Sequence, residues 1–497
     1  MTDLLLGVDA GTTVTKAVLF EASGREVARA STRVPLMYPE PHHVERDQNR
    51  LFDAVVEAIA SVLGMVDGAA ARVRAVGITS HGDGIYLVGA DGMPTRPGIM
   101  SLDTRAQGIC ERWEDNGIAD AAEVLTGQRP WPSSPAALLA WLRETEPDVI
   151  AASAWALPAK DALRMRLCGV VSTEPTEASL AFTNVRTQVY DPEVIAIYGL
   201  SDIASMLPPV FPCDSAPGVV TAEAAALTGL LAGTPIAATA HDVDCSAIGT
   251  GVIAPGVVSV VAGSFSINQV VSDAPVTGKG WLARNFVTPD RWMNMSISPT
   301  SSTNMEWFTQ QFAADELRRG AESGDAFRFV EDEIAGIDTD PSDVLFLPFL
   351  YGSPVNGPAS GAFLGLQGWH TRGHLLRAVM EGVALTHRLH VRTLATAFTI
   401  KAARLTGGAS RSDRWCQIFA DALGMPVEVT QVDESGAWGA AMLAGISAGV
   451  FTSLDDAVAQ SVHMERTFHP REGQLDAAIS HYETALHTLD PYWKAFT

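Results

Sequence analysis

The sequence predicts a mixed α/β fold built from two large domains. Strand-like and helix-like stretches alternate along the chain, a glycine hairpin has a relative in the second half, and 497 residues are too many for one hydrophobic core. The content of hydrophobic residues, 47%, is sufficient for two cores. We place the boundary near residue 245, which gives an N-terminal domain over 1–244 and a C-terminal domain over 245–497.

The elements alternate as expected of α/β layers rather than of a helix bundle or a β-sandwich. Short β-branched runs predict strands at 73–78, 85–88, 257–261, 344–348, 403–406 and 427–430. Longer runs with helical spacing predict helices at 51–63, 374–393, 412–423 and 439–448. Proline and glycine predict loops at 207–218 and 352–361.

The first hairpin consists of an apolar strand, a tight turn of small hydroxylated residues and a second β-branched strand. Gly11 lets the backbone approach an anion, and Thr12, Thr13 and Lys16 can donate hydrogen bonds or positive charge to phosphate oxygens. Asp9, at the end of the first strand, would repel phosphate unless a cation such as Mg²⁺ lay between them. The hairpin therefore predicts a phosphate site, since an ordinary edge hairpin would explain Gly11 but not Asp9 and Lys16.

A related hairpin follows at 255–271, where Gly263 and Ser264 form the turn. Aligning the two turns puts Val261 opposite Asp9, so the second turn offers backbone and hydroxyl donors but no carboxylate. The pair suggests a duplicated domain, with a chance resemblance between two glycine hairpins as the alternative.

Asp242 is the candidate catalytic base. An apolar strand at 234–238 is expected to deliver it to the start of a small-residue helix, at the mouth between the two halves, in which Gly249 and Gly251 allow close packing. Phosphoryl transfer to a sugar hydroxyl needs a base near that hydroxyl, and a carboxylate is sufficient. The alternative is that Asp242 caps the helix. Asp244 is interpreted as a helix-start charge rather than a second base.

A third glycine motif follows the strand at 403–406. Gly407 and Gly408 would let a flat ring or a phosphate lie against the backbone, and Ser412 can cap the next helix. A strand–turn–helix connection with a glycine hinge is the structural alternative. Because two other phosphate turns precede it, we interpret the motif as part of a nucleotide site.

Taken together, these motifs resemble those of the FGGY family of carbohydrate kinases over the whole chain. The first turn, the segment of Asp242, the second turn and Gly407-Gly408-Ala409 occur in the order and spacing of that family. The resemblance implies two actin-like (ribonuclease H-like) domains flanking a catalytic cleft. It also implies ATP with Mg²⁺ mainly on the second domain, sugar mainly on the first, and Asp9 as a metal ligand acting through water. The implied nucleotide contacts are Gly11, Thr12, Thr13, Lys16, Gly263, Ser264, Gly407, Gly408, Ala409 and Ser412.

The sugar site is expected around the segment 79–84. Asp83 falls where the family places an acidic residue or a histidine, and a turn-forming aspartate is the alternative. Trp131 could stack on a sugar or simply pack in its loop. His81 could contact the sugar or act from behind it. The sugar contacts implied by the resemblance are His81, Gly82, Asp83, Asp242, and the Asp-x-Arg element of Asp103 and Arg105, whose usual preceding aromatic residue and asparagine are replaced here.

Three segments, 298–308, 346–353 and 370–376, are similar to the L-xylulose/3-keto-L-gulonate kinase branch of the family, whereas Gly82-Asp83-Gly84 looks more like the erythritol kinase branch. The sequence therefore predicts ATP-dependent phosphorylation of L-xylulose or 3-keto-L-gulonate, with erythritol or another polyol as the alternative. A protein of another class, an actin-like ATPase or a sugar sensor, would share the phosphate turns without transferring phosphate to a sugar.

Charge and cysteine content narrow the possible partners. The net charge of −23 argues against nucleic acid or an anionic membrane. Five scattered cysteines indicate reduced structural thiols. The uncharged stretch 245–272 has the pattern of buried strands rather than of a membrane helix, and no signal peptide is visible, so we expect a cytoplasmic enzyme. The oligomeric state is open, and a homodimer is one of the states the sequence allows.

Overall fold

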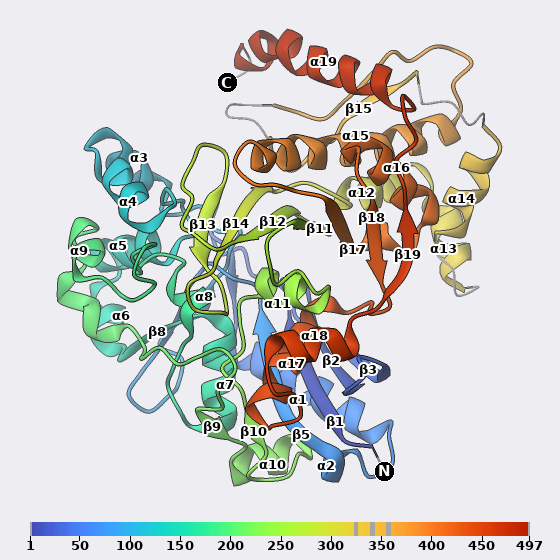
Figure 1. Cartoon of the computed structure of the whole chain (residues 1–497). Coiled ribbons are helices and arrows are strands. Elements are labelled where there is room, and N and C mark those ends of the chain that lie inside the picture. Colours follow the sequence, from blue (N-terminus) through green and yellow to red (C-terminus); the bar gives the residue numbers. More distant parts are fainter. Residues whose placement is uncertain (1, 323–326, 338–342, 354–358, 496–497) are drawn as a thin grey trace. The chain divides into compact units, whose positions relative to one another are not determined.

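The computed structural model describes residues 2–322, 327–337, 343–353 and 359–495 (Figure 1). Two compact units are present, each assembled from several segments of the chain. Unit 1 contains residues 1–253, 271–294 and 434–463, and unit 2 contains 254–270, 295–433 and 464–497. Both combine a sheet with helices, so the predicted mixed α/β class is confirmed.

The sheet of unit 1 has the strand order β3-β2-β1-β5-β10-β9. Strand β1 is antiparallel to β2 and parallel to β5, and β10 is parallel to β5. The central strand β1 is almost entirely buried because its leucines and valine pack on both faces of the sheet. The strands are β1 (Leu4–Ala10), β2 (Val14–Glu21), β3 (Glu26–Arg33), β5 (Val73–Ser80), β9 (Gly218–Val219) and β10 (Pro235–Ile236).

Some of the remaining elements of unit 1 pack on this sheet, and others form a second hydrophobic core of their own. Short strands are β4 (Glu45–Arg46), β6 (Tyr86–Val88), β7 (Gly98–Ile99), β8 (Trp155–Leu157) and β13 (Leu282–Asn285). Helices are α1 (Gln48–Gly64), α2 (Ala69–Arg72), α3 (Gln107–Asp115), α4 (Ile118–Thr126), α5 (Pro135–Thr145), α6 (Pro147–Ala152), α7 (Ala159–Cys168), α8 (Pro175–Ala178), α9 (Pro192–Ile197), η1 (Ser201–Met206), α10 (Ala222–Thr228), α11 (Asp242–Gly249), α17 (Ser435–Ser447) and α18 (Leu454–Ser461).

Helix α17 packs on the strands of unit 1 although it comes from the far end of the chain (Figure 1). Its approach depends on glycine in the strands. A Cβ on Gly7 of β1 would lie 2.1 Å from the carbonyl oxygen of Ala437, and a Cβ on Gly77 of β5 would lie 2.1 Å from that of Ala440. The missing side chains therefore allow backbone-to-backbone packing between strand and helix.

The strands of unit 2 include the run β12-β11-β17-β18-β19. Strand β11 is antiparallel to β12 and parallel to β17, and β17 is parallel to β18. The run β2-β1-β5-β10 in unit 1 has the same order and directions, as expected of two actin-like (ribonuclease H-like) sheets. The strands are β11 (Val257–Ala262), β12 (Ser266–Ser272), β14 (Trp292–Ser298), β15 (Leu345–Leu347), β16 (Ala362–Leu364), β17 (Ala402–Gly407), β18 (Val427–Thr430) and β19 (Met464–Phe468).

The helices of unit 2 are led by α15, which is long and largely buried. They are α12 (Thr303–Phe312), α13 (Ala314–Glu322), α14 (Arg328–Ala335), α15 (Arg372–Ala395), η2 (Gly408–Arg411), α16 (Asp413–Leu423) and α19 (Asp476–Lys494). Every strand and helix predicted above is present within a few residues of its predicted bounds, except that the strand expected at 234–238 is reduced to β10. The loop predicted at 352–361 lies partly outside the described residues.

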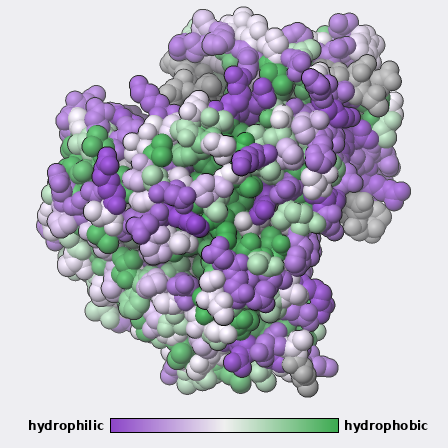
Figure 2. Space-filling model, in the orientation of Figure 1, coloured by the Kyte–Doolittle hydropathy of each residue, from purple (hydrophilic) through white to green (hydrophobic). Residues whose placement is uncertain are grey.

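The five cysteines are buried and unpaired, as expected of structural thiols. No helix in the described part of the chain is long and apolar enough to cross a membrane. The stretch 245–272 forms the end of α11, β11 and β12, in agreement with the prediction of strands. Hydrophilic and hydrophobic residues are intermixed on the face shown in Figure 2.

Candidate functional site

The first predicted phosphate turn joins β1 to β2, and its backbone is bound by the side chain of Arg46. The Arg46 guanidinium, fully buried, donates to the carbonyl oxygens of Gly11, at 3.1 Å, and Thr12. Thr12 is partly exposed and Thr13 is exposed, so the hydroxyls of both remain available at the surface of the turn. The turn therefore has the donors that phosphate requires, together with a buried positive charge behind it.

Asp9 and Lys16 are paired across the two strands of this hairpin. The Lys16 ammonium lies 2.7 Å from a carboxylate oxygen of Glu434, so its nearest anion is supplied by the segment that precedes α17. Burial raises the pKa of Asp9 to about 6, against the opposing effect of Lys16. A carboxylate in such surroundings gains stability from a bound cation, which favours its ionised form.

Asp242 is the first residue of α11, and His241 occupies the capping position without a side-chain cap bond. His241 rather than Asp242 thus occupies the capping position, although the Asp242 carboxylate accepts a hydrogen bond from the amide of Val243 in the first turn. Its side chain is 33% exposed, and its pKa is raised to about 8 by burial and by the nearby carboxylates of Asp9 and Asp83. The structure thus brings three of the predicted acidic side chains of unit 1 within electrostatic reach of one another.

Helix α11, which begins with Asp242, packs closely against a neighbouring helix at its other end. Gly249 allows α11 to meet α17, since a Cβ there would lie 2.0 Å from the carbonyl oxygen of Ser435. Gly251 does not serve this purpose, because it follows the helix with a positive φ of 77° and turns the chain. Nε2 of His241 lies 3.3 Å from Oδ1 of Asp242, and burial lowers the pKa of this histidine well below its usual value. The neighbour of Asp242 is therefore a neutral imidazole.

Asp83 lies in a strained turn beside a buried arginine. Its φ is +55°, a left-handed conformation that aspartate tolerates better than most residues. Oδ1 of Asp83 is 3.7 Å from the Arg284 guanidinium, which stands over the ring of Trp131 and donates to Oε1 of Gln128 at 3.0 Å. Burial raises the pKa of Asp83 to about 6, while Arg284 and a hydrogen bond from Trp131 act in the opposite direction.

The other predicted sugar residues have protein partners. His81 is buried, with Nδ1 3.3 Å from the carbonyl oxygen of Ala10 and Nε2 3.3 Å from the hydroxyl of Tyr86, which supports the reading of His81 as a residue acting from behind the site. Asp103 and Arg105 bind one another through bonds of 2.8–3.0 Å, and Arg105 also reaches Glu45. Asp103 also accepts from the amide of Val44 at 2.6 Å, so both side chains are engaged by other parts of the protein.

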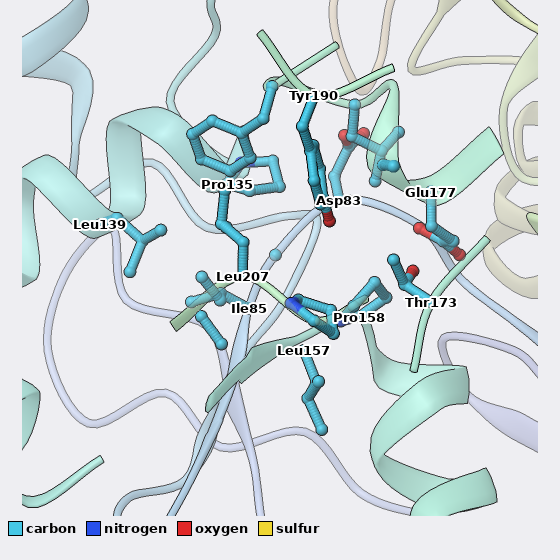
Figure 3. A pocket seen from close by; sticks show the side chains of 16 residues that line it. Asp83, Ile85, Pro135, Leu139, Leu157, Pro158, Thr173, Glu177, Tyr190 and Leu207 are labelled. Carbon is cyan, nitrogen blue, oxygen red and sulfur yellow. The ribbon is translucent and has the colours of Figure 1, made fainter. Parts of the chain in front are cut away.

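A small cavity of about 30 Å³ lies beside the predicted sugar turn (Figure 3). Asp83, Thr173, Glu177 and Tyr190 contribute its polar lining, and apolar residues such as Leu157 form the rest. This volume is sufficient for a water molecule. Both carboxyl oxygens of Glu177 lack a hydrogen-bond partner among the described residues, which is the environment that a buried water satisfies.

In unit 2 the second phosphate turn and the double glycine meet. Ala262 and Gly407 are partners in the parallel strands β11 and β17, and a Cβ on Gly407 would lie 2.6 Å from the carbonyl oxygen of Ala262. Ser302 fixes the turn from the other side, with its amide 2.9 Å from the carbonyl oxygen of Gly263 and its hydroxyl 2.7 Å from that of Ala262. Ser264 remains exposed at the tip of the turn.

Two further residues of the predicted nucleotide site have structural partners. Ala409 is fully buried. The hydroxyl of Ser412 accepts from the amide of Trp415 at 3.1 Å and donates to Glu331, so Ser412 caps α16 as predicted. Gly263, Ser264, Gly407 and Gly408 therefore form the accessible part of the motif.

The two units place corresponding motifs at corresponding positions. Ala10 ends β1 and pairs with Ser80 of β5, after which the chain enters His81-Gly82-Asp83. Ala262 ends β11 and pairs with Gly407 of β17, after which it enters Gly408-Ala409. The predicted sugar motif and the predicted nucleotide motif thus follow equivalent strands, as a duplicated fold requires.

Reasoning from the sequence missed Arg46, His241 and Arg284. Arginine has no local pattern that reveals a distant partner, and Arg284 is 156 residues from Gln128. His241 stands immediately before Asp242 and could have been noticed on that ground. Among the described residues no group of three or more His, Cys, Asp or Glu side chains has the arrangement of a metal cage.

Comparison with known proteins agrees with this arrangement. The family models for the N-terminal and C-terminal domains of the FGGY family of carbohydrate kinases match residues 4–249 and 258–448. The chain is 33% identical to an L-xylulose/3-keto-L-gulonate kinase of Escherichia coli over 474 residues, which covers 95% of this chain and 93% of that protein. It is 30% identical to an erythritol kinase of Brucella abortus over 99% of this chain and 97% of that protein.

A solved structure also resembles this fold over its full length. The crystal structure of a xylulose kinase from Rhodospirillum rubrum aligns with a TM-score of 0.86 and 26% identity, covering 99% of this chain and 100% of that one. The ranges matched by the two family models contain the two predicted phosphate turns, Asp242 and the double glycine. The chain belongs to the FGGY family of carbohydrate kinases and is a sugar kinase.

Proposed function

We propose that the enzyme transfers the γ-phosphate of Mg-ATP to a terminal hydroxyl of a small ketose, L-xylulose or 3-keto-L-gulonate, with Asp242 as general base. One observation carries the proposal: Asp242 begins α11 with a partly exposed carboxylate, and Asp9 and Asp83 are close enough to raise its pKa. A carboxyl group with a raised pKa is a stronger base once ionised.

Asp242 would accept the proton of the sugar hydroxyl as that oxygen attacks the γ-phosphorus. The transition state of phosphoryl transfer is loose, so the base needs position more than strength. The neutral His241 beside it adds no competing positive charge. Asp83, Trp131 and Arg284 would orient the sugar by hydrogen bonds and stacking.

The residues present fit a magnesium ion that is held mainly by phosphate. Mg²⁺ commonly binds one or two protein carboxylates and completes its shell with water and phosphate oxygens. Asp9 supplies a buried carboxylate next to the predicted phosphate turn, and its raised pKa would favour a bound cation beside it. When bound, Mg²⁺ would neutralise charge on the phosphates.

The nucleotide contacts are proposed on both predicted turns. In unit 2, Gly407 and Gly408 leave backbone accessible, and Ser264 presents its hydroxyl at the turn tip. In unit 1, Thr12 and Thr13 offer hydroxyls above the buried Arg46. Lys16 contributes positive charge to this side, although Glu434 is its partner in the structure.

The sugar itself is proposed from the relatives, and a second candidate has support of its own. The Escherichia coli relative is named for L-xylulose and 3-keto-L-gulonate, whereas the Brucella abortus relative, named for erythritol, covers almost the whole chain at 30% identity. Asp83 between two glycines suits either, because a carboxylate can accept two hydrogen bonds from neighbouring hydroxyls.

A panel of substrates decides between these candidates. ADP release should be measured with L-xylulose, 3-keto-L-gulonate, erythritol, xylitol and glycerol at equal concentrations. We expect the highest kcat/KM for one of the first two. A higher value for erythritol would replace the proposal with a polyol kinase, and ADP release that no sugar stimulates would favour the ATPase or sensor alternatives.

The Asp242→Asn variant tests the mechanism. It keeps the shape of the side chain but removes the base, so kcat should fall by about 10²–10⁴-fold while ATP affinity stays unchanged. Asp476→Asn is a matched control, because Asp476 is also the first residue of a helix, α19, whose capping position makes no side-chain bond. Near-normal turnover of Asp242→Asn, with the control also normal, would contradict the assignment.

A cytoplasmic location and a homodimer stay predictions.

A further inference from the structure

The chain that leads into Asp242 is held in a strained conformation. Thr239, three residues earlier, has a φ of +60°, which is unfavourable for a β-branched residue. Its amide donates to the carbonyl oxygen of Cys213 at 2.8 Å, and its hydroxyl lies within hydrogen-bond distance of the carbonyl oxygens of Ile78 and Ala238. Such strain persists only where surrounding contacts impose it, and it is frequent at functional sites.

The peptide group between Ala240 and His241, one residue after Thr239, is bound at both ends by threonine hydroxyls. The hydroxyl of Thr79, at the end of β5, donates to the Ala240 carbonyl oxygen at 2.8 Å. The amide of His241 donates to the hydroxyl of Thr176, in α8, at 2.9 Å. All four residues are buried, so neither bond can be replaced by bulk water. Only His241 separates this peptide from Asp242.

The Thr176 hydroxyl is itself fixed by a buried carboxylate. It donates to Oε1 of Glu174 at 2.8 Å while it accepts from His241, so its single hydrogen has one direction. Glu174 also accepts from the amides of Thr176 at 2.6 Å and Glu177 at 3.0 Å. The hydroxyl is therefore held in place by the cap of α8 rather than free to rotate.

A buried lysine links this carboxylate back to the same segment. The Lys160 ammonium lies 3.3 Å from Oε1 of Glu174, 3.0 Å from Oδ1 of Asp161 and 3.0 Å from the carbonyl oxygen of Ala238. All these side chains are at most 1% exposed. Moving any one of these charged groups away would leave an unpaired charge in the protein interior. Lys160, Asp161 and Glu174 therefore have one favoured arrangement.

We propose that the hydroxyls of Thr79 and Thr176 position Asp242 by clamping the Ala240–His241 peptide from opposite sides. Both are positioning residues, since each acts on the reacting sugar only through Asp242. Thr79 also pairs with Asp9 in the parallel strands β1 and β5, so the clamp ties the start of α11 to the strand that carries the predicted metal ligand. The inference rests on the proposed function of Asp242.

Thr176→Val tests the clamp, because valine keeps the shape and removes only the hydroxyl. We expect kcat to fall by about 10- to 100-fold, since a displacement of about 1 Å can cost that much, with KM for ATP and sugar almost unchanged. Thr176→Ser restores the hydroxyl and should restore most of the turnover. Thr79→Val, on the other side of the peptide, should lower kcat in the same way. It provides the test if Thr176→Val does not fold.

Thr228→Val is the matched control. Thr228 is also fully buried, and its hydroxyl donates to the carbonyl oxygen of Ala224 at 2.7 Å and accepts from the amide of Leu230 at 3.2 Å. It lies in α10 and has no part in the clamp. This variant should lose thermal stability, as Thr176→Val does, but keep its kcat. An equal loss of kcat in Thr228→Val would mean that the loss in Thr176→Val reflects lower stability rather than the position of Asp242.

A double mutant separates this inference from the proposed function. In an Asp242→Asn background, Thr176→Val should lower kcat no further, because the residue through which it acts is already lost. An additional loss of the same size as in wild type would overturn the clamp, as would a normal kcat in Thr176→Val and Thr79→Val. Normal turnover of Asp242→Asn itself would instead contradict the role of Asp242.

Discussion

Gly82 lies so close to the His241 ring that any side chain at position 82 would overlap the present position of the ring. A Cβ on Gly82 would lie 1.5 Å from Nε2 of His241, the same nitrogen that lies 3.3 Å from Oδ1 of Asp242. The glycine of the predicted sugar turn therefore determines where the histidine ring beside the predicted base can lie. The predicted sugar turn and the predicted base are therefore packed against one another through Gly82 and His241.

Gly82→Ala should displace the His241 ring and reduce kcat by about tenfold or more, because overpacking forces neighbouring side chains to move. The control is Gly64→Ala, where a Cβ meets nothing within 4 Å. Steady-state kinetics and thermal melting of both variants provide the measurement. If Gly82→Ala keeps wild-type kcat and KM, His241 has no influence on the site.

Asp9→Ala should weaken Mg-ATP binding much more than binding of ADP without metal, because the carboxylate interacts favourably with phosphate only through a cation. Calorimetric titration with both nucleotides measures the difference. Asp3→Ala, which removes an exposed aspartate just before β1, should change neither. Equal losses for the two nucleotides would mean that Asp9 supports the turn rather than the metal.

The pKa of Asp242, raised from 3.8 to about 8, makes stability depend on pH. In the unfolded chain this group is ionised from about pH 4 upward, whereas in the folded protein it keeps its proton until about pH 8, so stability is lost as pH rises between these values. Asp242→Asn removes that loss. Its melting temperature relative to wild type should therefore rise from pH 4 to pH 8 and then level off. A difference that does not vary with pH would contradict the shift.

Asp83 should set sugar preference more than catalytic power, since a site that binds a substrate hydroxyl discriminates against analogues lacking it. Asp83→Asn is the informative variant, because asparagine also tolerates the φ of +55° and preserves the turn. The ratio of kcat/KM between the two best sugars should change while the melting temperature stays the same. A preserved ratio with a lower melting temperature in Asp83→Ala would assign Asp83 to the turn alone.

Arg284 should distinguish a sugar acid from a neutral sugar. Its guanidinium is the positive group next to Asp83, and a hydrogen bond to a charged group contributes about 1.5–3 kcal/mol. Arg284→Gln should lower kcat/KM for 3-keto-L-gulonate by roughly tenfold more than for L-xylulose. The same factor for both sugars would show that the arginine does not contact a substrate carboxylate.

Much of the fold was accessible from sequence because its signals are local. Both hairpins, the cap at Ser412 and the glycines before helices depend on a few consecutive residues. The site was only partly accessible, because Arg46 and Arg284 act on residues far along the chain, and their types say nothing of those partners. Asp242 was identified by its surroundings in sequence, but its place as the first helical residue, with His241 before it, depends on how the preceding segment is bent at Thr239.

The packing of α17 against β1, β5 and α11 has a consequence for biosynthesis. Gly7, Gly77 and Gly249 all face this helix, yet its residues are synthesised almost two hundred positions after the end of α11. A ribosome that has completed residues 1–253 has produced most of unit 1 with its glycine-lined face still open to solvent. The unit that carries Asp9 and Asp242 therefore cannot complete its packing until nearly the whole chain has been synthesised. A nascent or prematurely ended polypeptide leaves this glycine-lined face accessible to chaperones and proteases.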